Sequence, residues 1–140
     1  WLAQAGSKKL GKWDPKTEKI TEYQDDWRKH TIRVHPDGSI WSTGGLTRFD
    51  PKTEKFSEYD LPPHTYPYRA EIDKNGEIWA STMHTDRVVR LDPRTGGAVQ
   101  YLMPSDTNMR TVFVDNSTTP VTFWVGNNHG ASVIKLEPLD

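Results

Sequence analysis

Residues 48–59 of this chain read RFDPKTEKFSEY, and the sequence contains two further versions of this pattern. Residues 12–23 read KWDPKTEKITEY, and residues 90–101 read RLDPRTGGAVQY. The aspartates of the three copies, Asp14, Asp50 and Asp92, are spaced by 36 and 42 residues. Tryptophans follow the same period, with spacings of 40, 38 and 45 residues between Trp1, Trp41, Trp79 and Trp124. Two markers at one period indicate an internal repeat, of a length that is typical of repeat architectures.

One repeat predicts four short strands. Residues 31–35, 40–43, 46–49 and 55–59 are rich in β-branched and aromatic residues and are separated by turn formers such as Pro36-Asp37-Gly38. Leu61-Pro62-Pro63 ends the unit, because proline has no N–H to donate to a sheet. No segment has helical periodicity. Four antiparallel strands in about 40 residues are typical of a β-propeller blade.

The predicted fold is therefore all-β, a partial β-propeller of four-stranded antiparallel blades that occupies residues 1–140 as a single domain. The blade segments are expected at residues 1–23, 31–59, 70–101 and 111–137, which amounts to about three and a half blades. Propellers close with roughly four to eight blades, so one copy falls short of a ring. Two explanations stay open: the chain is a C-terminal excerpt of a longer protein, or it assembles with copies of itself.

Composition excludes several classes of function. The net charge is −1, from 18 basic and 19 acidic residues, so no overall field attracts nucleic acid or an anionic membrane. No apolar run is long enough to span a bilayer. The absence of cysteine excludes disulfides, thiolate metal sites and a cysteine nucleophile, although it leaves the compartment undetermined. The sequence also has no nucleophile elbow and no phosphate-binding glycine loop.

Basic and aromatic residues precede the predicted innermost strands, and in a propeller these segments face one end of the central channel. They are Arg28, Lys29, His30, Tyr66, Tyr68, Arg69, Asn108 and Arg110. Arginine binds oxygens and tyrosine stacks on flat groups, so this channel rim predicts a pocket for an anionic, carbonyl-rich or sugar-like ligand. The alternative is that these side chains only solvate a channel mouth.

The stretch Gly126-Asn127-Asn128-His129-Gly130 replaces an ordinary hairpin and adds Asn127 and His129 as candidate ligand-binding residues. The alternative is a glycine-rich turn. His35, His64 and His84 are interpreted as turn or loop residues, and the four periodic tryptophans as core.

The repeats resemble those of the virginiamycin B lyase (streptogramin lyase) family of seven-bladed propellers. The resemblance is carried by His30–Thr43, by Leu46–Tyr59 with Leu61-Pro62, by Ile72–Trp79 and by Val88–Tyr101. More distant NHL-type and gluconolactonase-like propellers are alternatives. Relatives of this kind are often exported bacterial proteins, and this alone favours a periplasmic or extracellular location.

Enzymes of that family open a cyclic lactone antibiotic by elimination, using a histidine base and a magnesium ion. The family places this histidine eleven residues before the blade tryptophan, a position that His30 matches and that Tyr68 occupies in the next repeat. The fourth repeat has a longer turn and is aligned on its first strand instead, which brings Arg110 to this place. The family's metal-holding glutamates would fall where this chain has Arg28, Gln4, Gly44, Thr82 and Asn127. The resemblance therefore implies no metal site within this segment, and magnesium would need ligands from elsewhere in the ring.

Three functions follow as hypotheses. The first is a scaffold that binds a small-molecule or glycan-like ligand at the channel rim through Arg28, Tyr66, Tyr68, Arg69, Arg110, Asn127 and His129. The second is a magnesium-dependent carbon–oxygen lyase with His30 as its base. The third is a self-assembling partial propeller with a lectin-like or structural role. In each case the expected protein partners are further blades or copies of the same chain.

Overall fold

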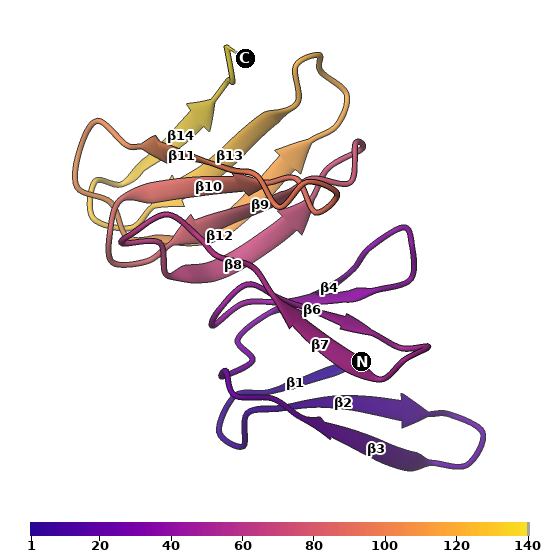
Figure 1. Cartoon of the computed structure of the whole chain (residues 1–140). Coiled ribbons are helices and arrows are strands. Elements are labelled where there is room, and N and C mark those ends of the chain that lie inside the picture. The colour runs from indigo at the N-terminus through magenta and orange to yellow at the C-terminus, as the bar shows by residue number, and fades with distance from the viewer. Residues whose placement is uncertain (140) are drawn as a thin grey trace. The chain divides into compact units, whose positions relative to one another are not determined.

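A computed structural model describes residues 1–139, and in this range the chain is built from strands and turns (Figure 1). The strands are β1 (Leu2–Gln4), β2 (Lys9–Asp14), β3 (Lys19–Gln24), β4 (Ile32–Val34), β5 (Ile40–Ser42), β6 (Thr47–Asp50), β7 (Lys55–Glu58), β8 (Pro67–Ile72), β9 (Ile78–Thr82), β10 (Arg87–Leu91), β11 (Ala98–Leu102), β12 (Met109–Asp115), β13 (Thr122–Asn127) and β14 (Ser132–Leu136). Within residues 1–139 there is no helix with the length and apolarity needed to cross a bilayer.

The strands form four antiparallel sheets in chain order, β1–β2–β3, β4–β5–β6–β7, β8–β9–β10–β11 and β12–β13–β14. Each strand pairs with its neighbour in sequence, as expected for hairpins joined by short turns. Sheets of three, four, four and three strands agree with the expectation of about three and a half four-stranded blades. The chain divides into two compact units, Trp1–Tyr59 and the part that starts at Asp60, and each holds two sheets.

The repeated Asp-Pro-Lys/Arg-Thr motif forms the turn between the third and fourth strands of a blade. Asp14, Asp50 and Asp92 each accept a hydrogen bond at 2.9 Å from the backbone N–H two residues later. The fifth residue of each turn, Glu18, Glu54 or Gly96, has a positive φ of 55°, 56° or 74°. Glycine adopts this conformation without strain, which accounts for the change from Glu to Gly in the third copy.

Aromatic rings fill the space between the two sheets of the first unit. Leu10 of β2 and Phe49 of β6 are buried in one cluster, and Trp1 and Tyr23 pack against it. The Phe49 ring lies with its centroid 4.6 Å from that of Tyr23 and 5.6 Å from that of Trp1. Aromatic pairs at such distances contribute beyond their buried area, and this suits a protein with few aliphatic core residues.

The core of the second unit is centred on Trp79 of β9. Its ring stacks on Phe123 of β13 at 5.5 Å and on Tyr101 of β11 at 5.9 Å, so it joins the two sheets. Trp41 and Trp79 are fully buried, as the repeat predicts for core positions. Trp124 is only half-buried, because it lies on the opposite face of its sheet from the core residues Phe123 and Val125.

Two strands begin earlier than predicted. β8 begins at Pro67 where Ala70 was expected, and β12 begins at Met109 where Thr111 was expected. Proline is tolerated at the first position of a strand, so Pro67 does not delay the sheet. Tyr68, Arg69 and Arg110 therefore belong to strands, whereas the sequence placed them in the segments before the strands.

Candidate functional site

A β-bulge lies at the start of β8 and of β12, and a similar irregularity directly precedes β4. In the second sheet the backbone N–H of His30 donates to the Thr43 carbonyl, and the backbone N–H of Thr43 donates to the Thr31 carbonyl. His30 and Thr31 therefore both face the single residue Thr43. In β8 the register shifts between Pro67 and Arg69, with Tyr68 as the extra residue.

The same irregularity recurs in β12. There Met109 pairs with Asn127 and Val112 pairs with Val125, so that Arg110 and Thr111 face the single residue Gly126. Counted from the bulge, His30, Tyr68 and Arg110 occupy the same place in three successive sheets. A bulge interrupts the ladder and redirects a side chain, and bulges are frequent next to functional sites.

In the first unit the bulge presents His30 and Arg28 to solvent, since both side chains are exposed. The Arg28 guanidinium donates from Nε to the Ala5 carbonyl at 3.5 Å, at the limit for a hydrogen bond. Gly44, whose φ is +116°, lies directly against the backbone of this segment. A Cβ at Gly44 would overlap the Arg28 carbonyl oxygen.

We expect Gly44→Ala to lower the free energy of unfolding of the first unit by about 2–3 kcal/mol, because strain at positive φ adds to this overlap. Gly38→Ala is the matched control: Gly38 has a φ of +88°, but nothing lies within 4 Å of its added Cβ. The control should cost only about 1–2 kcal/mol. Urea unfolding measures both losses, and equal losses would contradict the role of Gly44 in holding the Arg28 segment.

Lys29 does not belong to the channel rim, which corrects the sequence prediction. Its side chain is fully buried, and its ammonium forms an ion pair with Asp25 and donates to the Thr47 hydroxyl at 2.9 Å. The ammonium also lies 5.1 Å from the centre of the Phe56 ring. Burial lowers the pKa of Lys29, and the Asp25 carboxylate opposes this shift. Lys29 is thus a structural residue of the first unit.

In the second unit, Tyr66, Tyr68 and Arg69 lie at the start of β8, and Asn108 and Arg110 lie at the start of β12. These two strands are neighbours, since β12 packs against β8 and β9. Tyr66 and Arg110 are exposed, and Arg110 donates from Nε to Asn108 Oδ1 at 2.8 Å. The Nε of Arg69 is buried and has no hydrogen-bond partner among residues 1–139. Buried donors are rarely left unpaired, so this atom marks a place where a ligand or water is expected.

Asn127 and His129 form a tight hairpin between β13 and β14. The Asn127 side chain is buried, and its amide oxygen accepts the backbone N–H groups of His129 at 2.9 Å and Gly130 at 3.1 Å. Its amide nitrogen donates to the Asp106 carbonyl at 3.4 Å. Asn127 therefore stabilises the hairpin, while the imidazole of His129 is exposed.

The described residues do not fit a magnesium site. Across residues 1–139, no three His, Asp or Glu side chains come together in a way that could hold a metal ion. Magnesium needs oxygen ligands, usually carboxylates, and the family's glutamate positions carry neutral or basic residues here. Thr82, one of them, instead uses its hydroxyl to donate to the Arg87 carbonyl at 2.8 Å.

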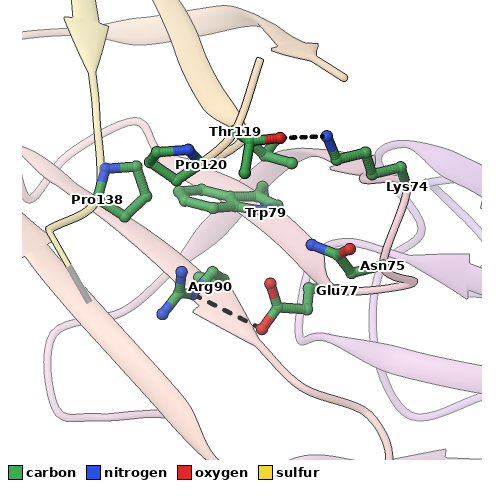
Figure 2. A pocket seen from close by; sticks show the side chains of 9 residues that line it. Lys74, Asn75, Glu77, Trp79, Arg90, Thr119, Pro120 and Pro138 are labelled. Atoms are coloured by element: carbon green, nitrogen blue, oxygen red, sulfur yellow. Dashed lines mark hydrogen bonds and ion pairs between the residues drawn. The ribbon is translucent and has the colours of Figure 1, made fainter. Parts of the chain in front are cut away.

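A cavity of about 330 Å³, which the sequence does not predict, lies at the opposite ends of the strands from Tyr68 and Arg110 (Figure 2). Glu77, Arg90 and Lys74 provide charged walls, and Pro120, Val121 and Pro138 provide apolar ones. Burial raises the pKa of the Glu77 carboxyl, and the charge of Arg90 opposes this shift. One sequence signal points to this place. Glu77 departs from the repeat, because the preceding blade has Ser39 at the same position.

The solved structures that are similar to this chain include three of lyases. Virginiamycin B lyase from Staphylococcus aureus, as its selenomethionine form, has a TM-score of 0.78 and 21% identity over 97% of this chain. A catalytically inactive form of that lyase with quinupristin has a TM-score of 0.79 and 20% identity over 97%. A streptogramin B lyase structure has a TM-score of 0.79 and 22% identity over 99%. The chain has the fold of these lyases.

This similarity confirms the predicted fold class, a partial β-propeller. The chain spans about half of the solved lyases, since the matches cover 50%, 50% and 51% of their chains. No family model and no curated protein matches the chain. At this level of identity the lyase structures establish the fold, and the function has to be inferred from the residues at the strand starts and in the cavity.

Proposed function

We propose that this chain is the part of a β-propeller that binds an anionic or carbonyl-rich ligand at the start of its innermost strands. The observation that carries the proposal is the β-bulge repeated at His30, Tyr68 and Arg110. Three successive sheets interrupt their ladders at the same place, and each interruption carries a polar or aromatic side chain.

The second unit supports this proposal with its charges. Arg69 and Arg110 come from the neighbouring strands β8 and β12, and the unpaired Arg69 Nε offers a desolvated donor. Guanidinium groups form strong, charge-assisted hydrogen bonds to carboxylate and carbonyl oxygens. Tyr66 and Tyr68 add aromatic surface beside them, on which a flat or sugar-like group would pack.

Quinupristin is a suitable first probe, because one of the similar lyase structures contains it. We expect saturable binding of quinupristin to the chain in isothermal titration calorimetry, weakened at least about tenfold by Arg110→Gln, because a hydrogen bond to a charged group contributes 1.5–3 kcal/mol. Arg94→Gln is the matched control, since Arg94 is an exposed arginine of the same unit in the turn at the other ends of the strands. D-glucuronate tests the sugar-like alternative in the same way.

If Arg94→Gln weakens binding as much as Arg110→Gln does, the ligand does not bind at the strand starts near Arg110. So would the absence of saturable binding of both probes.

A second candidate is a lyase, favoured by the exposed position of His30 on its bulge. An imidazole is well suited to remove a proton near neutral pH. Mass spectrometry of the same quinupristin mixtures, with and without magnesium, distinguishes the two candidates. Opening of the lactone that is lost in His30→Ala supports the lyase, and unchanged quinupristin supports the binding scaffold.

A further inference from the structure

The sheet β12–β13–β14 (Figure 1) carries exposed apolar side chains on the face opposite its core. Phe113 and Trp124 are cross-strand partners, and Val133 pairs with Gly126, two residues further along β13. The three apolar side chains therefore lie on one face of the sheet. Phe113 is 63% exposed and Val133 is 71% exposed. Clustered apolar side chains at a surface are typical of interaction sites.

The surroundings of Trp124 repeat those of two earlier tryptophans. Trp1 and Trp79 hold the same place in their repeats as Trp124 holds in the fourth. A basic side chain of the neighbouring strand lies over each ring, at 5.8 Å, 5.4 Å and 5.8 Å from its centroid, and these side chains are Lys12, Arg90 and Lys135 in chain order. The three tryptophans can therefore be compared directly.

The next sheet covers both of the earlier tryptophans with an aromatic ring. The Trp1 ring lies 5.6 Å from that of Phe49 in β6, and the Trp79 ring lies 5.5 Å from that of Phe123 in β13. Within residues 1–139 no such sheet lies on Trp124, so Phe113 and Val133 beside it stay exposed. The repeat thus indicates what fits this face: a sheet that presents a large apolar side chain where Phe49 stands.

The first sheet presents such a surface on its own outer face. Trp13 aligns in the repeat with Phe49, and Ile20 aligns with Phe56, the cross-strand partner of Phe49. Trp13 and Ile20 are themselves partners in β2 and β3, and they are 52% and 53% exposed. Leu2 lies on the same face of the sheet. One chain therefore carries both halves of a blade-to-blade contact, each uncovered within residues 1–139.

We propose that these two faces bind each other between copies of this chain. The outer face of β12–β14 in one molecule packs on the outer face of β1–β3 in another, as Trp1 packs toward Phe49 and Trp79 on Phe123 within the chain. Because the two faces differ, the assembly is head-to-tail. The net charge of −1 opposes association only weakly. The chain spans about half of the similar lyases, so a second copy brings the assembly to about their length.

Sedimentation equilibrium of the full chain over a dilution series measures this association. We expect the average mass to rise above the 16.0 kDa of one chain as the concentration increases. Phe113→Glu alters only the face of β12–β14, and Ile20→Glu alters only the face of β1–β3. Each should weaken association at least about tenfold, because its carboxylate would be buried against an apolar surface without a cation.

Leu102→Glu is the matched control. Leu102 is 67% exposed, similar to Phe113, but it lies in β11 of a different sheet, so this variant should associate like the unmodified chain. Near-UV circular dichroism checks that all three variants stay folded. Unfolding of the separate units is measured in dilute samples, because association of folded copies would raise the apparent stability.

Mixing the two impaired variants tests the head-to-tail direction. Phe113→Glu keeps an intact β1–β3 face and Ile20→Glu keeps an intact β12–β14 face, so neither variant associates with itself. Their mixture has one productive contact, and the remaining two faces are blocked. We therefore expect a complex of one copy of each variant, with twice the mass of a single chain, and no larger species.

Four results would overturn the proposal. They are a mass of 16.0 kDa at every concentration, self-association of Ile20→Glu or of Phe113→Glu alone, the absence of a complex in the mixture, and an equal loss of association in Leu102→Glu. The inference goes beyond the proposed function, and neither face contains His30, Tyr68 or Arg110. Quinupristin binding should therefore be unchanged in both variants, so that the two proposals can fail separately.

Discussion

Trp79→Ala is expected to lower the free energy of unfolding of the second unit by about 3–5 kcal/mol, a large part of the stability of a small domain. The substitution removes a fully buried ring that stacks on Phe123 and Tyr101. It also removes the indole N–H that donates to Asp73 Oδ2 at 3.0 Å, so a buried carboxylate loses one of its donors. The cavity left behind adds to the loss, because the surrounding sheets can relax only in part.

Trp13→Ala is the control for this experiment. Trp13 is 52% exposed on the solvent side of the first sheet, so its removal should change the free energy of unfolding by no more than about 0.5 kcal/mol. Urea unfolding followed by far-UV circular dichroism measures both variants. If the two substitutions cost the same, Trp79 does not join the two sheets as described.

The second large effect is expected at Lys29, where Lys29→Met should destabilise the first unit by about 3–5 kcal/mol. Methionine fills the same space but leaves the carboxylate of Asp25 buried and without its cation, which is the costly way to break a buried ion pair. The Thr47 hydroxyl loses a donor at the same time.

The double variant Asp25→Leu/Lys29→Met tests the cause of this loss. Replacing both charges with apolar groups removes the uncompensated carboxylate, so it should recover most of the stability lost in the single variant. Unfolding in urea at neutral pH provides both values. A single variant as stable as the unmodified chain, or a double variant less stable than the single one, would contradict the structural role assigned to Lys29.

The sequence was sufficient to predict the blades, because its signals are local and repeated. Asp50 and its counterparts fix the hairpin turns through their own side chains, and the strands between turns alternate as a half-buried sheet requires. Trp41 and Trp79 were correctly placed in the core, since the repeat gives both the same position in a blade.

The sites were harder to predict because they depend on register and on contacts between strands. The bulge at Tyr68 follows from the pairing of β8 with β9, which the sequence pattern does not specify to one residue. Lys29 looked like a rim residue because lysine is rarely fully buried, and only the structure reveals Asp25 beside it. The Glu77 cavity needs a turn of the next sheet, 116–121, as a wall.

The extra residue at the start of β8 and of β12 has a consequence for how such a protein acquires new specificities. A residue inserted in a bulge stands outside the regular pairing, so its identity is nearly independent of the forces that build the blade. Histidine, tyrosine and arginine occur at this place in one chain without a change of fold. Natural selection or protein engineering can therefore change the side chain at these positions one blade at a time while the fold stays the same.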